Sequence, residues 1–189
     1  MNISLPGLLS QLLLGLVNGS FYAILSLGLA VIFGLLNVIN FAHGALFMMG
    51  AVLTWMAMTY FNVNYWVMLV AAPLVVGVFG ILIERLLLRW IYKLDHLYGL
   101  LLTLGLTLLI EGAFRSFYGV SGLSYDTPEQ LEGAFNLGFM MLPKYRVWVV
   151  AASLVVCFST WFVIERTRLG AYLRAGTENP RLVEAFGIN

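Results

Sequence analysis

Three polar residues that could do chemistry, Asn37, Asn40 and His43, are spaced three apart in the segment NVINFAHGA. No Asp, Glu, Lys or Arg occurs before Glu84, so the segment belongs to a strongly apolar region. A polar group without a hydrogen-bond partner in hydrocarbon costs about several kcal/mol, so each of these three side chains needs a partner. On a helix this spacing places all three on one face. We expect that face to meet protein or a water-filled cavity rather than lipid.

Two interpretations of this polar face remain open. It could be a polar clasp between helices at a bend, or the bend could line a translocation path. The neighbouring small residues Ala42, Gly44 and Ala45 would let another backbone approach closely in either case. A similar packing contact is expected in the first helix, at Gly15, Asn18, Gly19 and Ser20.

The composition indicates a protein with several membrane-spanning helices. Of the 189 residues, 61% are hydrophobic and 10% are charged, whereas about a quarter of a soluble domain is charged. The net charge of +1 and the lack of a basic block give no reason to expect nucleic-acid binding. The single cysteine, Cys157, excludes an intrachain disulfide and a multi-cysteine metal site, and we expect it to serve helix packing.

Apolar runs of about 20 residues are long enough to cross hydrocarbon as helices. The fold class expected is an all-α, polytopic membrane bundle, with spans near 8–36, 42–61, 65–84, 97–118 and 145–164. The loop near 85–96 and the tail after Ile164 are basic, and the loop 119–142 is acidic. Because basic loops stay in the cytoplasm, we place those two segments inside and the acidic loop outside.

Glu84 and Arg146 lie at the very ends of predicted spans, and Glu111 and Arg115 are the acid and base that lie further inside one. They lie four residues apart with the acid first, the favourable order for an ion pair on a helix. The pair could snorkel to the outer membrane surface, or it could contact a solute or partner in an outer vestibule.

The tail carries the signature of a short helix that must dock on something. Its cap, first turn, apolar face and stop are formed by Asn179, Pro180, Leu182, Val183, Phe186 and Gly187. Two helical turns are not stable alone in water. We therefore expect the segment to dock on this protein's own cytoplasmic surface, on a partner's groove or on lipid headgroups.

Three segments together carry a family resemblance: NVINFAHGALFMMGA, LLLTLGLTLLIEG and RAGTENPRLVEAFGIN. In order and spacing they closely resemble permease subunits of branched-chain amino acid ABC importers, within a group that includes simple-sugar permeases. The resemblance implies that residues 165–189 form a cytoplasmic coupling segment, in which Pro180 to Gly187 seat on an ATPase. It also implies that residues 1–189 form one transmembrane permease domain, expected to be the front part of a longer permease.

The resemblance further implies the setting of the chain. Its partners would be the lipid bilayer, cytosolic ATPase subunits, a second permease subunit of the same or another sequence, and an external solute-binding protein. The chain would hold no cofactor, because ATP would be bound by the ATPase partners. The solute would be a branched-chain amino acid or a related small polar molecule, carried across the bacterial inner (plasma) membrane.

Nothing in the sequence suggests an enzyme, because no Walker A motif, metal-spaced His/Cys cluster or Ser-His-Asp set can be assembled. Two alternatives to an ABC permease remain: a gradient-driven transporter or channel, and a structural membrane subunit. A gradient-driven transporter is expected to pair a titratable residue near the midplane, whereas this chain offers only Glu111 and Arg115 near the rim.

Overall fold

The computed structural model describes residues 5–36, 40–91, 94–125, 127–179, 183 and 185–187. Within these residues, five helices are long and apolar enough to cross a membrane, which confirms the expected all-α polytopic fold. The candidate spans are Leu5–Gly34, Ala42–Phe61, Tyr65–Ile91, Leu97–Tyr118 and Lys144–Arg166. The chain divides into two compact units, one made of residues 1–37 with 127–189 and the other of residues 38–126.

The first unit is made of the N-terminal and C-terminal parts of the chain. Its elements are helix α1 (Leu5–Leu36), the short 3-10 turn η2 (Glu129–Leu131), strands β1 (Ala134–Asn136) and β2 (Met141–Pro143), and helices α6 (Lys144–Arg166) and α7 (Arg168–Glu178). The strands pair antiparallel, with Ala134 opposite Pro143, and form a small hairpin just before α6. The sequence indicated neither this hairpin nor α7, since the first lies in the segment expected as a loop and the second in the polar tail.

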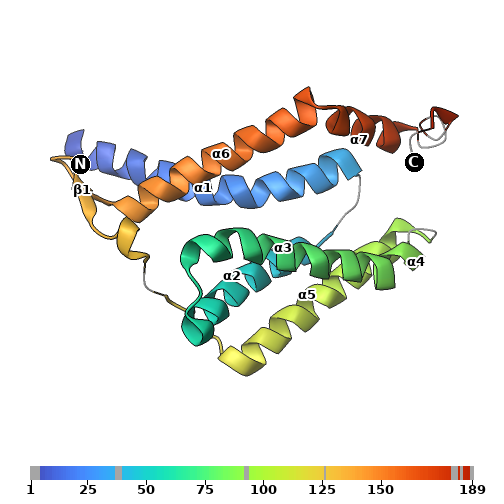
Figure 1. The fold of residues 1–189 in the computed structure, drawn as a ribbon, viewed down its shortest axis with the longest axis horizontal. Helices are drawn as coiled ribbons and strands as arrows, with labels where there is room; N and C mark the ends of the chain where they lie inside the picture. Colours follow the sequence, from blue (N-terminus) through green and yellow to red (C-terminus); the bar gives the residue numbers. More distant parts are fainter. Residues whose placement is uncertain are drawn as a thin grey trace. The chain divides into compact units, whose positions relative to one another are not determined.

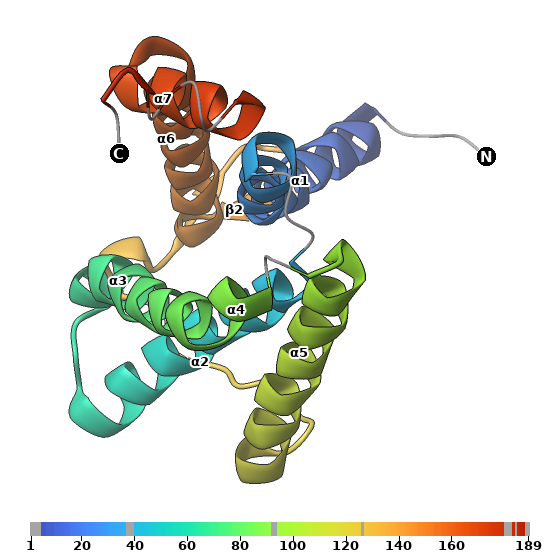
Figure 2. The ribbon, with the colours of Figure 1, turned by 90° about the vertical axis from the view of Figure 1, so that its right-hand side faces the viewer.

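Helices α1 and α6 lie side by side (Figures 1 and 2). Val17 and Ser20 of α1 and Val149 and Ser153 of α6 are buried. The Ser20 hydroxyl donates to the carbonyl of Val17 at 2.7 Å, so its polar group is satisfied within its own helix. Small, internally paired side chains of this kind let membrane helices pack closely.

The expectation of a packing contact in the first helix is thus confirmed for Ser20, whereas the two glycines make no close contact with the described residues of this chain. A Cβ atom added at Gly15 or Gly19 would meet no described atom within 4 Å. Hydropathy and small-residue spacing cannot tell which face of an apolar helix meets a neighbouring helix of the same chain.

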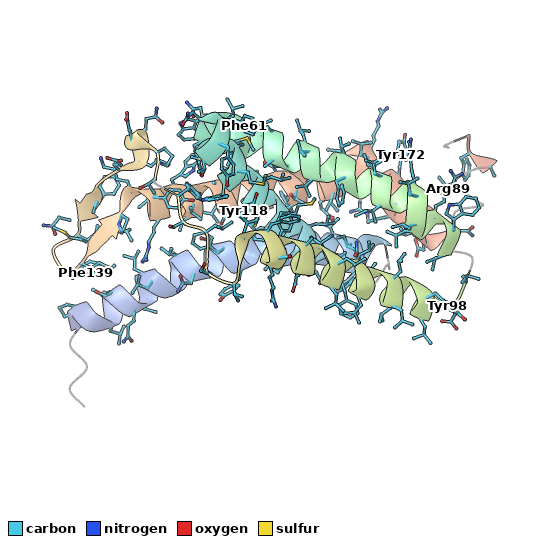
Figure 3. All side chains as sticks on the ribbon, turned by 90° about the horizontal axis from the view of Figure 1, so that it is seen from below. Phe61, Arg89, Tyr98, Tyr118, Phe139 and Tyr172 are labelled. Atoms are coloured by element: carbon cyan, nitrogen blue, oxygen red, sulfur yellow. The ribbon has the colours of Figure 1, made fainter. Side chains whose placement is uncertain are left out.

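The second unit is built on helix α2 (Ala42–Phe61), which contacts both α3 (Tyr65–Ile83) and α5 (His96–Tyr118). The π-helical turn η1 (Glu84–Leu88) and the short helix α4 (Arg89–Ile91) continue α3. In η1 the Arg89 N–H donates to the Glu84 carbonyl, five residues back. Figure 3 shows the two ends of this unit, with Phe61 and Tyr118 at one and Arg89 and Tyr98 at the other.

Polar residues fix where these helices begin and end. Asn62 ends α2 in the left-handed conformation, with φ 50° and ψ 34°, which asparagine tolerates better than most residues. Asn64 caps α3 by accepting the Trp66 N–H at 3.0 Å, and Asp95 caps α5 by accepting the Leu97 N–H at 3.1 Å. Only residues 62–64 therefore separate α2 from α3.

Candidate functional site

The polar segment that motivated the transport hypothesis lies at the start of α2. The Asn40 side-chain oxygen accepts the N–H of Ala42, the first residue of α2, at 3.0 Å. Asn40 thus precedes the helix and His43 lies inside it, so the prediction that they share one helical face is wrong. The reason is that asparagine readily bonds the backbone two residues ahead, which competes with helix formation. Asn37 lies outside the described residues.

A threonine of α5 provides a second hydrogen bond at the start of α2. The Phe41 N–H donates to the Thr103 hydroxyl oxygen at 3.3 Å, and that hydroxyl donates to the Leu100 carbonyl at 3.1 Å. Only 1% of Thr103 is exposed. Sequence reasoning missed Thr103, although a hydroxyl inside the apolar run LLTLGLTLL was a usable signal.

The small residues at the start of α2 behave as predicted in two of three cases. Ala42 and Ala45 are 2% and 1% exposed, which confirms that the helix packs closely there. A Cβ atom at Gly44 would meet no described atom within 4 Å, so close approach does not depend on that glycine.

The chemistry open to this site is hydrogen bonding. Its described polar groups are amides, a hydroxyl and the half-buried imidazole of His43. For Asn40 the geometry favours the structural interpretation, because its side chain is engaged in capping. A role of His43 and Asn37 in a solute path stays a prediction. Among the residues that the structure describes, no group of three or more His, Cys, Asp or Glu could hold a metal ion.

The end of the second unit that we predict to be external carries an aromatic cluster. Trp55 meets Tyr60 and Tyr118 edge-on, with ring centroids 5.7 and 5.5 Å apart. Its indole N–H donates to the Ser124 carbonyl at 3.1 Å, which ties the segment after α5 to α2. Aromatic residues of this kind are typical of membrane interfaces.

The predicted pair of Glu111 and Arg115 forms, with 3.6 Å between a carboxylate oxygen and a guanidinium nitrogen. The side chains are 36% and 67% exposed, respectively. An exposed ion pair contributes about 0–1 kcal/mol to stability, and a contact of this pair with a solute or partner stays a prediction.

The predicted coupling segment, residues 165–189, contains α7, and the part expected to dock on the ATPase begins at the end of that helix. Asn179 ends α7, with its N–H bonded to the Ala175 carbonyl at 3.0 Å. Its own carbonyl accepts the Val183 N–H at 3.3 Å, and the Val183 carbonyl accepts the Phe186 N–H at 3.1 Å. Gly187 then adopts φ +76°, a conformation that favours glycine. Pro180 and Leu182 lie outside the described residues.

The two apolar residues described in that part differ in burial. Val183 is half-buried, and Phe186 is 76% exposed. The phenyl ring is therefore available for docking, while the role of the segment in coupling stays a prediction.

Comparison with known proteins identifies the family. The model of the branched-chain amino acid transport system permease component matches residues 11–189. The chain belongs to this permease family. The resemblance on three segments is thereby confirmed. The five candidate spans and this membership together make the chain a multi-pass inner-membrane protein.

Curated relatives of this permease family align over most of the chain. BraD, a high-affinity branched-chain amino acid transport system permease protein of Pseudomonas aeruginosa, is 28% identical over 96% of this chain and 62% of its own length. LivH of Escherichia coli K12, described in the same words, is 24% identical over the same two shares. A probable LivH of Methanocaldococcus jannaschii is 24% identical over 92% of this chain and 56% of its own. The chain thus spans about three fifths of the length of these permeases. No solved structure matches it significantly.

Proposed function

We propose that this chain is a transmembrane permease subunit of an ATP-binding cassette importer that moves branched-chain amino acids into the cytoplasm. The observation that carries the proposal is the family match over residues 11–189, which covers all but the start of α1. The relatives BraD and LivH are named as branched-chain amino acid permeases, and their identity to this chain supports the same class of solute.

The partners proposed are cytosolic ATPase subunits, a second permease subunit and an external solute-binding protein. The chain itself would need no cofactor, because ATP would be bound by the ATPase subunits. In support, the Asn179 carbonyl accepts the Val183 N–H, the Val183 carbonyl accepts the Phe186 N–H, and the Phe186 side chain is exposed. An exposed aromatic side chain is a favourable anchor for a small interface.

Uptake by proteoliposomes tests this function. The chain is reconstituted with its companion permease and ATPase subunits, and radiolabelled leucine uptake is measured with the binding protein outside and ATP inside. We expect uptake that needs ATP and the ATPase subunits and that persists when ionophores dissipate ion gradients. Uptake that is abolished by ionophores and unaffected by removal of ATP would instead identify a gradient-driven transporter. Absence of leucine uptake with full ATP-driven uptake of another solute would refute the proposed substrate alone.

A further inference from the structure

The junction between α6 and α7 is short and unusually tight. Thr167 alone separates the last residue of α6 from the first of α7. Its hydroxyl donates to the Val163 carbonyl and also accepts the Gly170 N–H at 3.5 Å, so one side chain serves both helices. Figure 1 shows α7 changing direction immediately at the end of α6.

Gly170 is the point where the two helices touch. It is buried, and a Cβ atom placed there would overlap the Ile164 carbonyl group and lie 2.6 Å from the Ile164 Cα. The obstruction is backbone, which cannot rotate away as a flexible side chain would. Any larger residue at this position must therefore push α7 away from the last turn of α6.

Arg174 holds the same junction one turn further along α7. Its Nη1 donates to the Ile164 carbonyl and to a Glu165 carboxylate oxygen, both at 2.9 Å. The last carbonyls of a helix have no partner within it, and a cation placed there also favours the helix dipole. The ion pair alone is weak because both side chains are about half exposed, but the carbonyl bond fixes the direction of the guanidinium.

Apolar burial does not explain how α7 is held. Its large apolar side chains, Leu169, Tyr172 and Leu173, are 65%, 44% and 45% exposed. They are spaced as one helical face, which is not the face that carries Gly170 and Arg174. Contact with the end of α6 therefore depends on Gly170 and Arg174, together with the hydroxyl of Thr167.

We propose that Gly170 and Arg174 are positioning residues that lock α7 onto the end of α6, so that the two helices move as one rigid elbow. Asn179, where the segment predicted to dock begins, is the C-cap of α7, so the elbow sets where that segment starts relative to a membrane span. The proposal rests on the proposed function for one point, that the segment Asn179–Gly187 docks on an ATPase. The rigidity of the elbow itself is independent of that function.

The test of rigidity is a distance distribution between two spin labels. The whole chain, with Cys157→Ser, carries labels at Val155→Cys on α6 and Glu178→Cys on α7, and is measured by pulsed electron resonance in lipid nanodiscs. We expect a narrow distribution that Gly170→Ala shifts by roughly 1.5 Å, the extra separation needed to reach normal carbon–oxygen contact. Arg174→Ala should broaden it, and Glu165→Gln, which retains an acceptor, should change it less.

Gly176→Ala is the matched control, because a Cβ atom at Gly176 on the same helix meets no described atom within 4 Å. It should leave the distribution unchanged. An unchanged distribution in Gly170→Ala and Arg174→Ala, or an equal change in Gly176→Ala, would overturn the elbow.

The proposed effect of the elbow on transport is tested by the amount of leucine taken up per ATP hydrolysed in the reconstituted importer. We expect Gly170→Ala to lower this ratio while Gly176→Ala preserves it. A displaced α7 with a normal ratio would overturn the positioning role. Failure of the unsubstituted chain to bind any ATPase subunit would instead refute the proposed function and leave the rigid elbow standing.

Discussion

The backbone N–H of Phe41 donates to the hydroxyl oxygen of Thr103, although 62 residues separate them in the chain. A hydroxyl from α5 thereby satisfies a donor at the start of α2, in a part of the protein where most surroundings are apolar. An amide left without a hydrogen-bond partner in such surroundings lowers stability. This bond therefore fixes where along α5 the start of α2 packs.

Replacing Thr103 by valine should destabilise the protein, because the shape is kept while the acceptor for Phe41 is lost. We expect a loss of about 1 kcal/mol in the free energy of unfolding, measured by denaturant titration in mixed micelles. Thr107→Val is the control, since among the described residues the Thr107 hydroxyl bonds the Thr103 carbonyl within its own helix. Equal losses in the two variants would contradict the interhelical role.

Asn40→Ala should remove the side-chain acceptor at the start of α2 and cost about 1 kcal/mol of stability. Asn40→Asp keeps an oxygen that can accept the Ala42 N–H, so it should retain the cap. Thermal unfolding of the purified variants would measure both. If alanine and aspartate were equally harmful, capping would not be the role of this residue.

His43→Leu tests the path interpretation separately from stability. We predict that leucine uptake is lost while membrane insertion is kept and thermal stability falls only modestly. His43→Gln, which keeps a hydrogen-bonding group, should retain more uptake. Full uptake by the leucine variant would exclude a role of His43 in the solute path.

Phe186→Ala should weaken association with the ATPase subunit without affecting membrane insertion, because it removes the exposed apolar anchor of the coupling segment. Co-purification yield and ATP-driven uptake are the measurements. Phe117→Ala is the matched control, since Phe117 is 83% exposed but lies near the opposite end of its span from the predicted cytoplasmic side. Wild-type yield and uptake in Phe186→Ala would disprove the coupling role.

The predicted topology is checked by labelling single cysteines in a Cys157→Ser background with an impermeant thiol reagent. A cysteine replacing Glu129, before the hairpin, should react from outside the cell. One replacing Glu178, at the end of α7, should react only after the membrane is opened. The reversed pattern would invert the assignment of every loop.

The sequence was sufficient to locate the membrane helices because length and hydropathy respond to the bilayer itself. The predicted second span, 42–61, coincides with α2, and the last one, 145–164, lies within α6. Contacts between helices were much harder to predict from the sequence. The sequence shows Thr103 only as a hydroxyl in an apolar run, and its bond to the start of α2 depends on how the helices pack. It shows Gly170 only as a glycine that weakens a helix, and its contact with Ile164 depends on the turn between α6 and α7.

The widened turn at Glu84–Leu88 has a consequence for chain length. A π turn holds an additional residue in an otherwise α-helical ladder, which is how a helix accommodates a one-residue insertion without breaking. Deleting one residue there would let the backbone hydrogen bonds continue in the α-helical pattern from α3 into α4. Deleting one residue in the middle of α2 would instead rotate every later side chain of α2 about the helix axis. We therefore expect this basic end of the third span to tolerate single-residue deletions that the second span does not.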